Sequence, residues 1–421
     1  MPDTPTQDSK PAAQALRALV PPRAKPWIIG GGIALLLVIV FLILRPSGEK
    51  RDLRELTGLG FSIDTCVDSN SSAPVPRSEC LALRASPSLT TSQLATALPH
   101  LKGLDRRLEL NLAGAQVDSI DSLNGLDTLE SLDLTGTSVW RIDALKGMRS
   151  LKRLVLHRTE VENIDALKEL TGLQSLSLWD TRVANLDALK PLTDLQLLDL
   201  RDTQVRDLDP LEDLPHLETL KLGGARNVRD IDPLGQLTTL KTLDLNETQV
   251  ESIGALKKLR ELQALYLANT PVRNIDALKG TPSLKTLVLD GSRVENIDAI
   301  RGLTQLDTLV LARTQVTRID ALKDLHKLQR LNLADTTIDN IDALGGLKEL
   351  QSLNLFRTRV RSIDALKGMT SLRELYLANT PVDDVDVLKG LTGLREVVLY
   401  GTRARNVDEI KSALPKTRVV W

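Results

Sequence analysis

The sequence has few of the residues that build metal sites, disulfide frameworks and aromatic cores. It contains 2 Cys and 4 His in 421 residues, which is too few for a multi-ligand Cys/His zinc site or a cysteine-rich secreted scaffold. Aromatic residues make up 2% of the chain against 42% for all apolar residues, so the core must be built from aliphatic side chains. The formal net charge of −1 leaves no polybasic character that would indicate nucleic-acid binding.

One long apolar run is present near the N-terminus. Residues 27–44 read WIIGGGIALLLVIVFLIL, 18 residues without a charge, which span roughly 27 Å as a helix and predict a single-pass transmembrane segment. A cleaved signal peptide and a buried core helix are the alternatives, but the run is long for a signal peptide and no A-x-A-like site follows it. Gly30 and Ala34 form a small-xxx-small pair that would allow weak self-association. Residues 1–26, rich in Pro, Ala, Gln and Ser, predict a disordered tail.

The two cysteines bear on which side of the membrane the rest of the chain occupies. Basic residues at the two ends of the apolar run are nearly balanced, so counting them does not decide the orientation. Cys66 and Cys80 lie 14 positions apart, and a disulfide between them would stabilise the fold by about 3 kcal/mol. A disulfide needs an oxidising compartment, which favours an extracytoplasmic location at the plasma (inner) membrane. Two inert, reduced cysteines are the alternative.

After the cysteines the sequence repeats every 22 residues. The template is LxxLxLxxTxVxxIDALKxLxx, and two clear copies are LKRLVLHRTEVENIDALKELTG at 151–172 and LQSLNLFRTRVRSIDALKGMTS at 350–371. Thirteen full units occupy residues 107–393, of which the unit from Leu217 has 23 residues, and residues 394–421 begin a partial unit. This pattern resembles the leucine-rich repeat family, in particular the short class found in bacterial internalins and in the regulatory subunit of protein phosphatase 1.

The repeat predicts a curved α/β solenoid, a leucine-rich repeat superhelix preceded by one transmembrane helix. In Leu-x-Leu alternate side chains point to one side, as in a β-strand, and no unit can bury its leucines alone. Stacked strands about 4.8 Å apart would form a parallel concave sheet with short helical turns outside. The recurring Asp of Ile-Asp-Ala-Leu-Lys is expected to be a helix N-cap, because one carboxylate per coil cannot converge on a calcium ion. Thr at the ninth position, where the family usually has Asn, is expected to bond backbone groups at the turn.

The segments outside the full repeats are assigned by what a solenoid needs at its ends. An uncovered terminal coil would expose its leucines and a free strand edge. Residues 45–62 are expected to be a linker. Residues 63–106, with the predicted disulfide, are expected to form an N-terminal cap, and residues 394–421 a partial repeat with a closing C-terminal cap.

No catalytic constellation or cofactor site is predicted. The four His occupy different repeat positions, so none partners a repeated Ser, Cys or Asp. Gly223-Gly224 lacks the lysine of a phosphate-binding loop and the spacing of a dinucleotide motif. The sequence therefore predicts a protein that is not an enzyme and that binds no cofactor, no metal and no nucleic acid.

The concave sheet is the predicted binding surface. Alternation along each strand places the fifth and seventh residues of a unit in solvent, and half of the ten aromatic residues fall on these positions. Exposed aromatic side chains on a rigid surface are typical of binding hot spots. The predicted partner-binding residues are Trp179, Tyr266, Val288, Val310, Phe356, Tyr376, Val398 and Tyr400. The alternative is that the rings only pack across strands.

Taken together, the sequence predicts a membrane-anchored extracytoplasmic protein that binds a protein partner, with the main contact near the C-terminal end of its concave face. An envelope glycan is an alternative ligand, since Trp and Tyr also stack on sugar rings. The sequence is also compatible with a membrane-tethered cytoplasmic regulatory or scaffold subunit and with a spacer that has no ligand.

Overall fold

The structure is a computed structural model, and it describes four stretches of the chain: residues 48–64, 66, 80–104 and 106–421. The expected tail and transmembrane segment, residues 1–44, lie outside these stretches, as does the Gly30–Ala34 pair. Within the described stretches, no helix combines the length and the apolar character needed to cross a membrane.

The chain divides into two units, Met1–Glu55 and Leu56–Trp421, and the second contains all the repeats. Residues 45–62, expected to be a linker, include helix α3 (Gly48–Gly58). Its Leu53 and Leu56 lie three positions apart, which places them on one face of a helix, and Leu56 is buried.

Two strands and a helix precede the repeats, in and just before the range 63–106 that is predicted as an N-terminal cap. Strand β1 (Phe61–Asp64) pairs antiparallel with β2 (Cys80–Ala85), and β2 pairs parallel with β3 (Arg107–Asn111), the first strand of the repeats. Helix α4 (Thr91–Lys102) begins with a capping box, in which the Thr90 hydroxyl accepts the Gln93 N–H and the Gln93 side chain accepts the Thr90 N–H. This helix buries apolar side chains that would otherwise leave the first coil uncovered.

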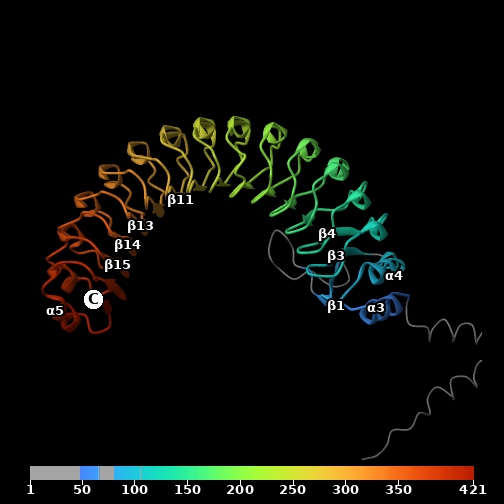
Figure 1. The fold of residues 1–421 in the computed structure, drawn as a ribbon, viewed down its shortest axis with the longest axis horizontal. Helices are drawn as coiled ribbons and strands as arrows, with labels where there is room; N and C mark the ends of the chain where they lie inside the picture. The colour runs from blue at the N-terminus through green and yellow to red at the C-terminus, as the bar shows by residue number, and fades with distance from the viewer. Residues whose placement is uncertain (1–47, 65, 67–79, 105) are drawn as a thin grey trace, which may run out of the picture. The chain divides into compact units, whose positions relative to one another are not determined.

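Each repeat adds one short parallel strand to a continuous sheet of 17 strands in the described residues. Figure 1 shows these strands on the inner side of the arc formed by the repeats and the short helical turns on its outer side. The Leu at the fourth position of one unit pairs with its counterpart in the next, as Leu287 does with Leu309. The remaining repeat strands are β4 (Leu129–Asp133), β5 (Arg153–Val155), β6 (Ser175–Ser177), β7 (Leu197–Asp199), β8 (Thr219–Lys221), β9 (Thr242–Asp244), β10 (Ala264–Tyr266), β11 (Thr286–Val288), β12 (Thr308–Val310), β13 (Arg330–Asn332), β14 (Ser352–Asn354), β15 (Glu374–Tyr376) and β16 (Glu396–Val398).

The outer turns are 3-10 helices of three to five residues rather than α-helices. They are η2 (Asp121–Leu123), η3 (Asp143–Leu145), η4 (Asp165–Glu169), η5 (Asp187–Leu189), η6 (Asp209–Leu211), η7 (Asp232–Gln236), η8 (Gly254–Lys258), η9 (Asp276–Gly280), η10 (Asp298–Ile300), η11 (Asp320–Leu322), η12 (Asp342–Leu344), η13 (Asp364–Leu366) and η14 (Asp386–Gly390).

The expectation that the repeated Asp caps these turns is wrong, because the Asp is the first residue of the turn. In η4 the cap position is Ile164, which has no side-chain hydrogen bond to offer. The Asp165 N–H instead donates to Asn163 Oδ1 at 2.7 Å, and its carboxylate lies 2.6 Å from Lys168 Nζ. A polar side chain at the thirteenth position therefore holds the start of the turn. The same bond is made by Ser119, Asn185, Asp207, Asp230, Ser252, Asn274, Asn296, Asn340, Ser362 and Asp384.

The core is an aliphatic column that runs the length of the repeats. Leu, Val and Ile at the first, fourth, sixth, eleventh, fourteenth and seventeenth positions are buried, as in Leu151, Leu154, Leu156, Val161 and Ile164. The ninth-position Thr is buried with them, and its hydroxyl donates to the carbonyl three residues earlier, as in Thr159 to Leu156 O at 2.8 Å. The role predicted for this Thr is confirmed in ten units, whereas the Thr402 hydroxyl of the last, partial unit has no hydrogen-bond partner among the described residues.

Each coil turns at its eighth residue, where φ is positive in every unit. The values run from 51° at Arg158 to 77° at Gly224. In the 23-residue unit, Ala225 and Val228 occupy the buried positions that follow this turn, so the extra residue lies between them. The strands on both sides stay in register, with Leu220 paired to a Leu in each neighbour.

The C-terminal end closes with helix α5 (Val407–Ala413) and strand β17 (Arg418–Val420). Strand β17 pairs parallel with β16, so Val420 extends the row begun by Val398. Both elements lie within residues 394–421, where the sequence predicts a partial repeat with a closing C-terminal cap.

Candidate functional site

The predicted partner-binding residues form two separate apolar rows on the concave sheet. Tyr266, Val288 and Val310 are neighbours at the ends of β10, β11 and β12. Tyr376 and Val398 are neighbours at the ends of β15 and β16. All five side chains are partly exposed. Asn332 and Asn354, on the two intervening strands, separate the rows with polar side chains.

The second row is wider than the sequence indicated and is called the C-terminal apolar surface below. It consists of Phe356, Tyr376, Val398, Tyr400 and Val420. Tyr400, 46% exposed, is the most exposed aromatic of the predicted set. Val420 joins the row through its pairing with Val398 and was not among the predicted residues. The sequence predicts a short apolar strand at the end of the chain. Aligning that strand in register with the preceding one would have placed Val420 beside Val398.

Charged side chains flank this surface and are bonded to it or to one another. The Tyr376 hydroxyl donates to Glu396 Oε2 at 3.3 Å, and burial is the main reason that the pKa of this phenol is raised. Arg418 bonds the same carboxylate at 2.9 Å, and the Arg357 guanidinium lies 5.2 Å from the centre of the Phe356 ring. The apolar centre thus has a polar rim, the arrangement of protein-binding surfaces.

Trp179 differs from the rest of the predicted residues, because charged neighbours surround it. The guanidinium carbons of Arg158 and Arg201 lie 5.3 and 4.6 Å from its ring, and its indole N–H donates to Asp202 Oδ2 at 2.9 Å. The ring of His157 meets it edge-on at 5.2 Å. These contacts fit the alternative that the ring packs across strands, and because Trp179 is still partly exposed, its role in partner binding stays a prediction.

A polar cluster surrounds Trp179 on β6 to β8. Arg201 holds Asp199, which is only 3% exposed, through two bonds of 2.9 and 2.6 Å, and Lys221 approaches the same carboxylate at 4.0 Å. The hydrogen bond with Asp199 raises the pKa of Arg201. Burial lowers the pKa of His157, and the carboxylates nearby only partly oppose that effect.

The structure also brings His157 against Ser177 of the next coil, a contact that the sequence analysis missed because the two residues are 20 positions apart. Their Nε2 and Oγ atoms share a hydrogen bond. A nucleophilic serine needs its histidine oriented by a third group, and among the described residues no carboxylate is bonded to the second imidazole nitrogen. The pair therefore belongs to the packing around Trp179.

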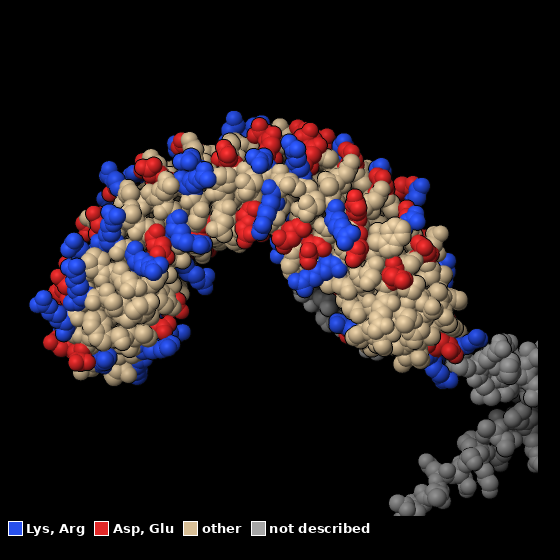
Figure 2. Space-filling model, viewed as in Figure 1, with Lys and Arg blue, Asp and Glu red and all other residues tan. Residues whose placement is uncertain are grey.

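Two further sets of surface residues were missed. The third position of each unit also faces the concave side, by the same alternation that exposes the fifth, and it brings Arg153, Leu197 and Glu374 onto this face. Trp140 lies at the twelfth position, outside the sheet, and is 59% exposed. Figure 2 shows positive and negative side chains mixed along the arc in the view drawn, without one continuous surface of either sign.

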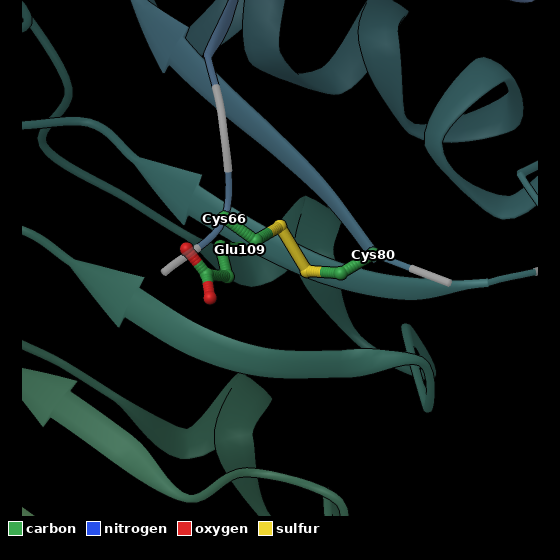
Figure 3. A group of neighbouring side chains, drawn as sticks. All are labelled: Cys66, Cys80 and Glu109. Carbon is green, nitrogen blue, oxygen red and sulfur yellow. A yellow bond between two sulfur atoms is a disulfide. The ribbon is translucent and has the colours of Figure 1, made fainter. Parts of the chain in front are cut away.

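The predicted cysteine pair is at disulfide distance. Figure 3 shows Cys66 bonded to Cys80 with Glu109 beside them, and the two sulfur atoms are 2.11 Å apart. A carboxylate oxygen of Glu109 and the two sulfurs lie within 4.8 Å of one another, a spacing that a metal ion would accept. With the sulfurs joined to each other, no thiolate remains to bind a metal. Burial raises the pKa of the Glu109 carboxyl.

Comparison with known proteins bears on the fold and on the class of protein. A family model described as leucine-rich repeats (2 copies) matches residues 193–236 and 238–280. No curated protein matches the chain. A crystal structure of an internalin (inlF) from Listeria monocytogenes is similar at 25% identity, with a TM-score of 0.63, over 77% of this chain and 89% of that one.

Two more solved structures share the fold at lower identity. A leucine-rich repeat protein of Leptospira interrogans is 21% identical, with a TM-score of 0.68, over 79% of this chain and 95% of that one. The plant peptide hormone receptor RGFR1, in complex with RGF2, is 19% identical, with a TM-score of 0.61, over 70% of this chain and 51% of that one.

Leucine-rich repeat proteins generally mediate protein–protein binding, and the repeats of this family and of its internalin-like neighbours are non-enzymatic interaction scaffolds. The resemblance inferred from the LxxLxL pattern is therefore confirmed: the matched repeats and the fold are consistent with the leucine-rich repeat family and resemble the internalins.

Proposed function

We propose that this protein is a membrane-anchored, extracytoplasmic binding protein whose C-terminal apolar surface contacts a protein partner. The observation that carries the proposal is the placement of Phe356, Tyr376 and Tyr400 on three consecutive coils of a rigid sheet. These rings lie on the solvent side of the strands, where the leucine core does not require them. Large apolar side chains placed in this way contribute most of the binding energy at protein interfaces.

The chemistry of the surface favours a protein over a glycan as the ligand. Val398 and Val420 extend the aromatic patch with aliphatic side chains, which offer nothing to a sugar hydroxyl. The Glu396 carboxylate beside these side chains is already engaged, since it accepts from both Tyr376 and Arg418. A partner with an apolar centre and a polar rim fits these features.

Anchoring and location rest on two features of the chain. The uncharged run at residues 27–44 has the length of a membrane-spanning helix. The Cys66–Cys80 pair, at disulfide distance, supports a compartment that oxidises thiols. In such a protein the repeats stand outside the cytoplasm and present the concave face to partners there.

Triple substitution of Phe356, Tyr376 and Tyr400 by Ser tests the binding surface. We expect the variant to keep the circular dichroism spectrum of the wild type and to lose the proteins that the wild type captures from envelope extracts. The control carries Ser at Arg206, Glu251 and Arg273, which are exposed twelfth-position residues outside the sheet. An unchanged set of captured proteins would contradict the placement of the contact. Loss of glycan rather than protein capture would support a glycan as the ligand.

Thiol labelling in intact cells tests the location. We expect Cys66 and Cys80 to resist a thiol-specific reagent until a reductant is added. Two freely labelled thiols would instead support a cytoplasmic, membrane-tethered protein.

A further inference from the structure

A depression of about 740 Å³ lies away from the concave sheet, on the loops that follow β4, β5 and β6 and lead into the outer turns. Trp140, Glu162 and Ala184 line it from the twelfth position of three consecutive units. Ala184 and Ala188 are small, so they leave a hollow beside the larger side chains. A volume of this size is typical of sites that bind a small molecule or a single side chain.

Trp140 is the most exposed large apolar side chain among the described residues, at 59%. The Arg141 guanidinium lies 5.2 Å from the ring centre, and Asp143 holds that guanidinium in place through a bond of 3.1 Å to Arg141 Nε. The ring is thus oriented by its neighbours while most of its surface remains in solvent. Several units place exposed polar or charged residues at this position, among them Asp118, Arg206 and Glu251. The aliphatic core therefore does not require a Trp there.

Glu162 is the charged side chain of the depression that has no partner within the described part of the chain. The charged groups around it are paired with one another or with neighbouring residues. Arg182 bonds Glu160 at 3.0 Å, and Asp165 accepts from Lys168 at 2.6 Å. The Glu162 carboxylate stands one coil from Trp140 at the same repeat position, so the two side chains come from adjacent loops.

Backbone hydrogen bonds hold these loops together before any ligand binds. The Glu160 N–H donates to Val139 O at 3.0 Å, and the Arg182 N–H donates to Val161 O at 3.1 Å. The loops that carry Trp140, Glu162 and Ala184 are therefore joined in series. A preformed site of this kind loses little conformational entropy on binding.

We infer that this depression, the Trp140 site, is a second binding site and that it takes a cationic side chain, Lys or Arg, of a protein partner. The face of a Trp ring attracts a cation more strongly than any other aromatic side chain does. An unpaired carboxylate supplies the opposite charge and can accept hydrogen bonds from an ammonium or guanidinium group. The site uses no residue of the C-terminal apolar surface, so this inference stands independently of the proposed function.

The hydrogen-bonding groups around the depression disfavour a sugar as the ligand. A sugar needs several free donors and acceptors aimed at its hydroxyl groups. Here the Asn163 side chain bonds both the backbone and the carboxylate of Asp165, and Asn185 does the same with Asp187. Because these groups are occupied, the part of the Trp140 ring that Arg141 leaves exposed and the charge of Glu162 remain for a ligand.

Titration of the full-length protein with a fluorescently labelled hexa-arginine peptide tests the inference by anisotropy. The matched probe is hexa-citrulline, which has the same shape without the charge. We expect hexa-arginine to bind more tightly than hexa-citrulline, and Trp140→Ala and Glu162→Gln each to raise its Kd about fivefold. Two control variants should leave the Kd unchanged. Trp421→Ala removes an exposed Trp elsewhere, and Glu251→Gln removes a twelfth-position carboxylate on another unit.

Several outcomes would overturn the inference. Equal binding of the two peptides, or no binding of hexa-arginine, would each do so. An equal loss of hexa-arginine affinity in the control variants would also overturn it, because that result would indicate only general attraction to the acidic surface. Binding of a neutral oligosaccharide that depends on Trp140 would also overturn it and would assign the site to glycans. Circular dichroism of each variant separates these outcomes from misfolding, which exposed substitutions rarely cause.

Discussion

Replacing both Cys66 and Cys80 with Ala is expected to destabilise the N-terminal end of the solenoid by about 3 kcal/mol. The cysteines are 14 positions apart, and closing a loop of about 15 residues restricts the unfolded chain by that amount of free energy at 25 °C. Both cysteines are buried, and Cys80 begins β2, the strand that covers β3. Ala keeps the site apolar, so the change reports the loss of the bond rather than a buried hydroxyl.

Hydrogen exchange with mass spectrometry is the assay of choice, because a repeat array need not unfold in one step. Each coil contacts only its neighbours, so faster exchange should appear in β1 to β3 and be absent from β16. Wild-type protein treated with a reductant is the matched control and should show the same pattern. Unchanged protection of β2 in the variant, or an equal loss in β16, would refute the reasoning.

Three smaller changes test further parts of the structure. Burial lowers the pKa of His157, so the unfolded chain binds a proton at this imidazole more readily than the folded chain does. The free energy of unfolding should therefore fall as the pH drops below about 6.5, and urea titrations at pH 7.5 and pH 5 should show a smaller fall for His157→Asn than for the wild type. Burial raises the pKa of Glu109 above 4.5, so its charged form is disfavoured in the folded state. Glu109→Gln should therefore raise the melting temperature at pH 7, and the variant and the wild type should melt at similar temperatures at pH 3, where the carboxyl is protonated. Thr314→Val removes a bond of 2.6 Å to the Leu311 carbonyl and should cost about 1 to 3 kcal/mol in denaturant unfolding, whereas Thr337→Val, at an exposed position, should change little.

The positions of the strands could be predicted because one spacing rule governs every coil. Leu309 of β12 lies between Leu287 and Leu331, as stacking of fourth-position leucines requires. The ninth-position Thr followed from hydroxyl chemistry in the same way. The role of the repeated Asp did not, because rules for α-helix caps do not transfer to a 3-10 turn that starts at the Asp itself. The side chain that accepts the hydrogen bond at the start of the turn, such as that of Asn163, differs in type from unit to unit. The repeat template therefore has no fixed residue at this position.

The candidate site was predicted only in part, because the exposure of a side chain depends on the coils beside it. Alternation placed Trp179 on the concave face correctly, yet Arg158 and Arg201, each 21 or 22 positions away, cover its ring. Trp140 could not be predicted in this way, because alternation along a strand gives no information on residues in the loops that follow it. A large apolar residue at a position that several units keep polar was the signal that could have drawn attention to it.

The uniform turn at the eighth residue allows the length of the arc to change by whole repeat units. Because every coil leaves this turn in the same direction, removal of residues 306–327 would join equivalent points of two units, and the arc would shorten by about 4.8 Å. Removal of half a unit would instead direct leucines into water. Gain or loss of whole units in the middle of the chain can therefore alter the separation between the Trp140 site and the C-terminal apolar surface while both keep their shape, which suits partners of different size.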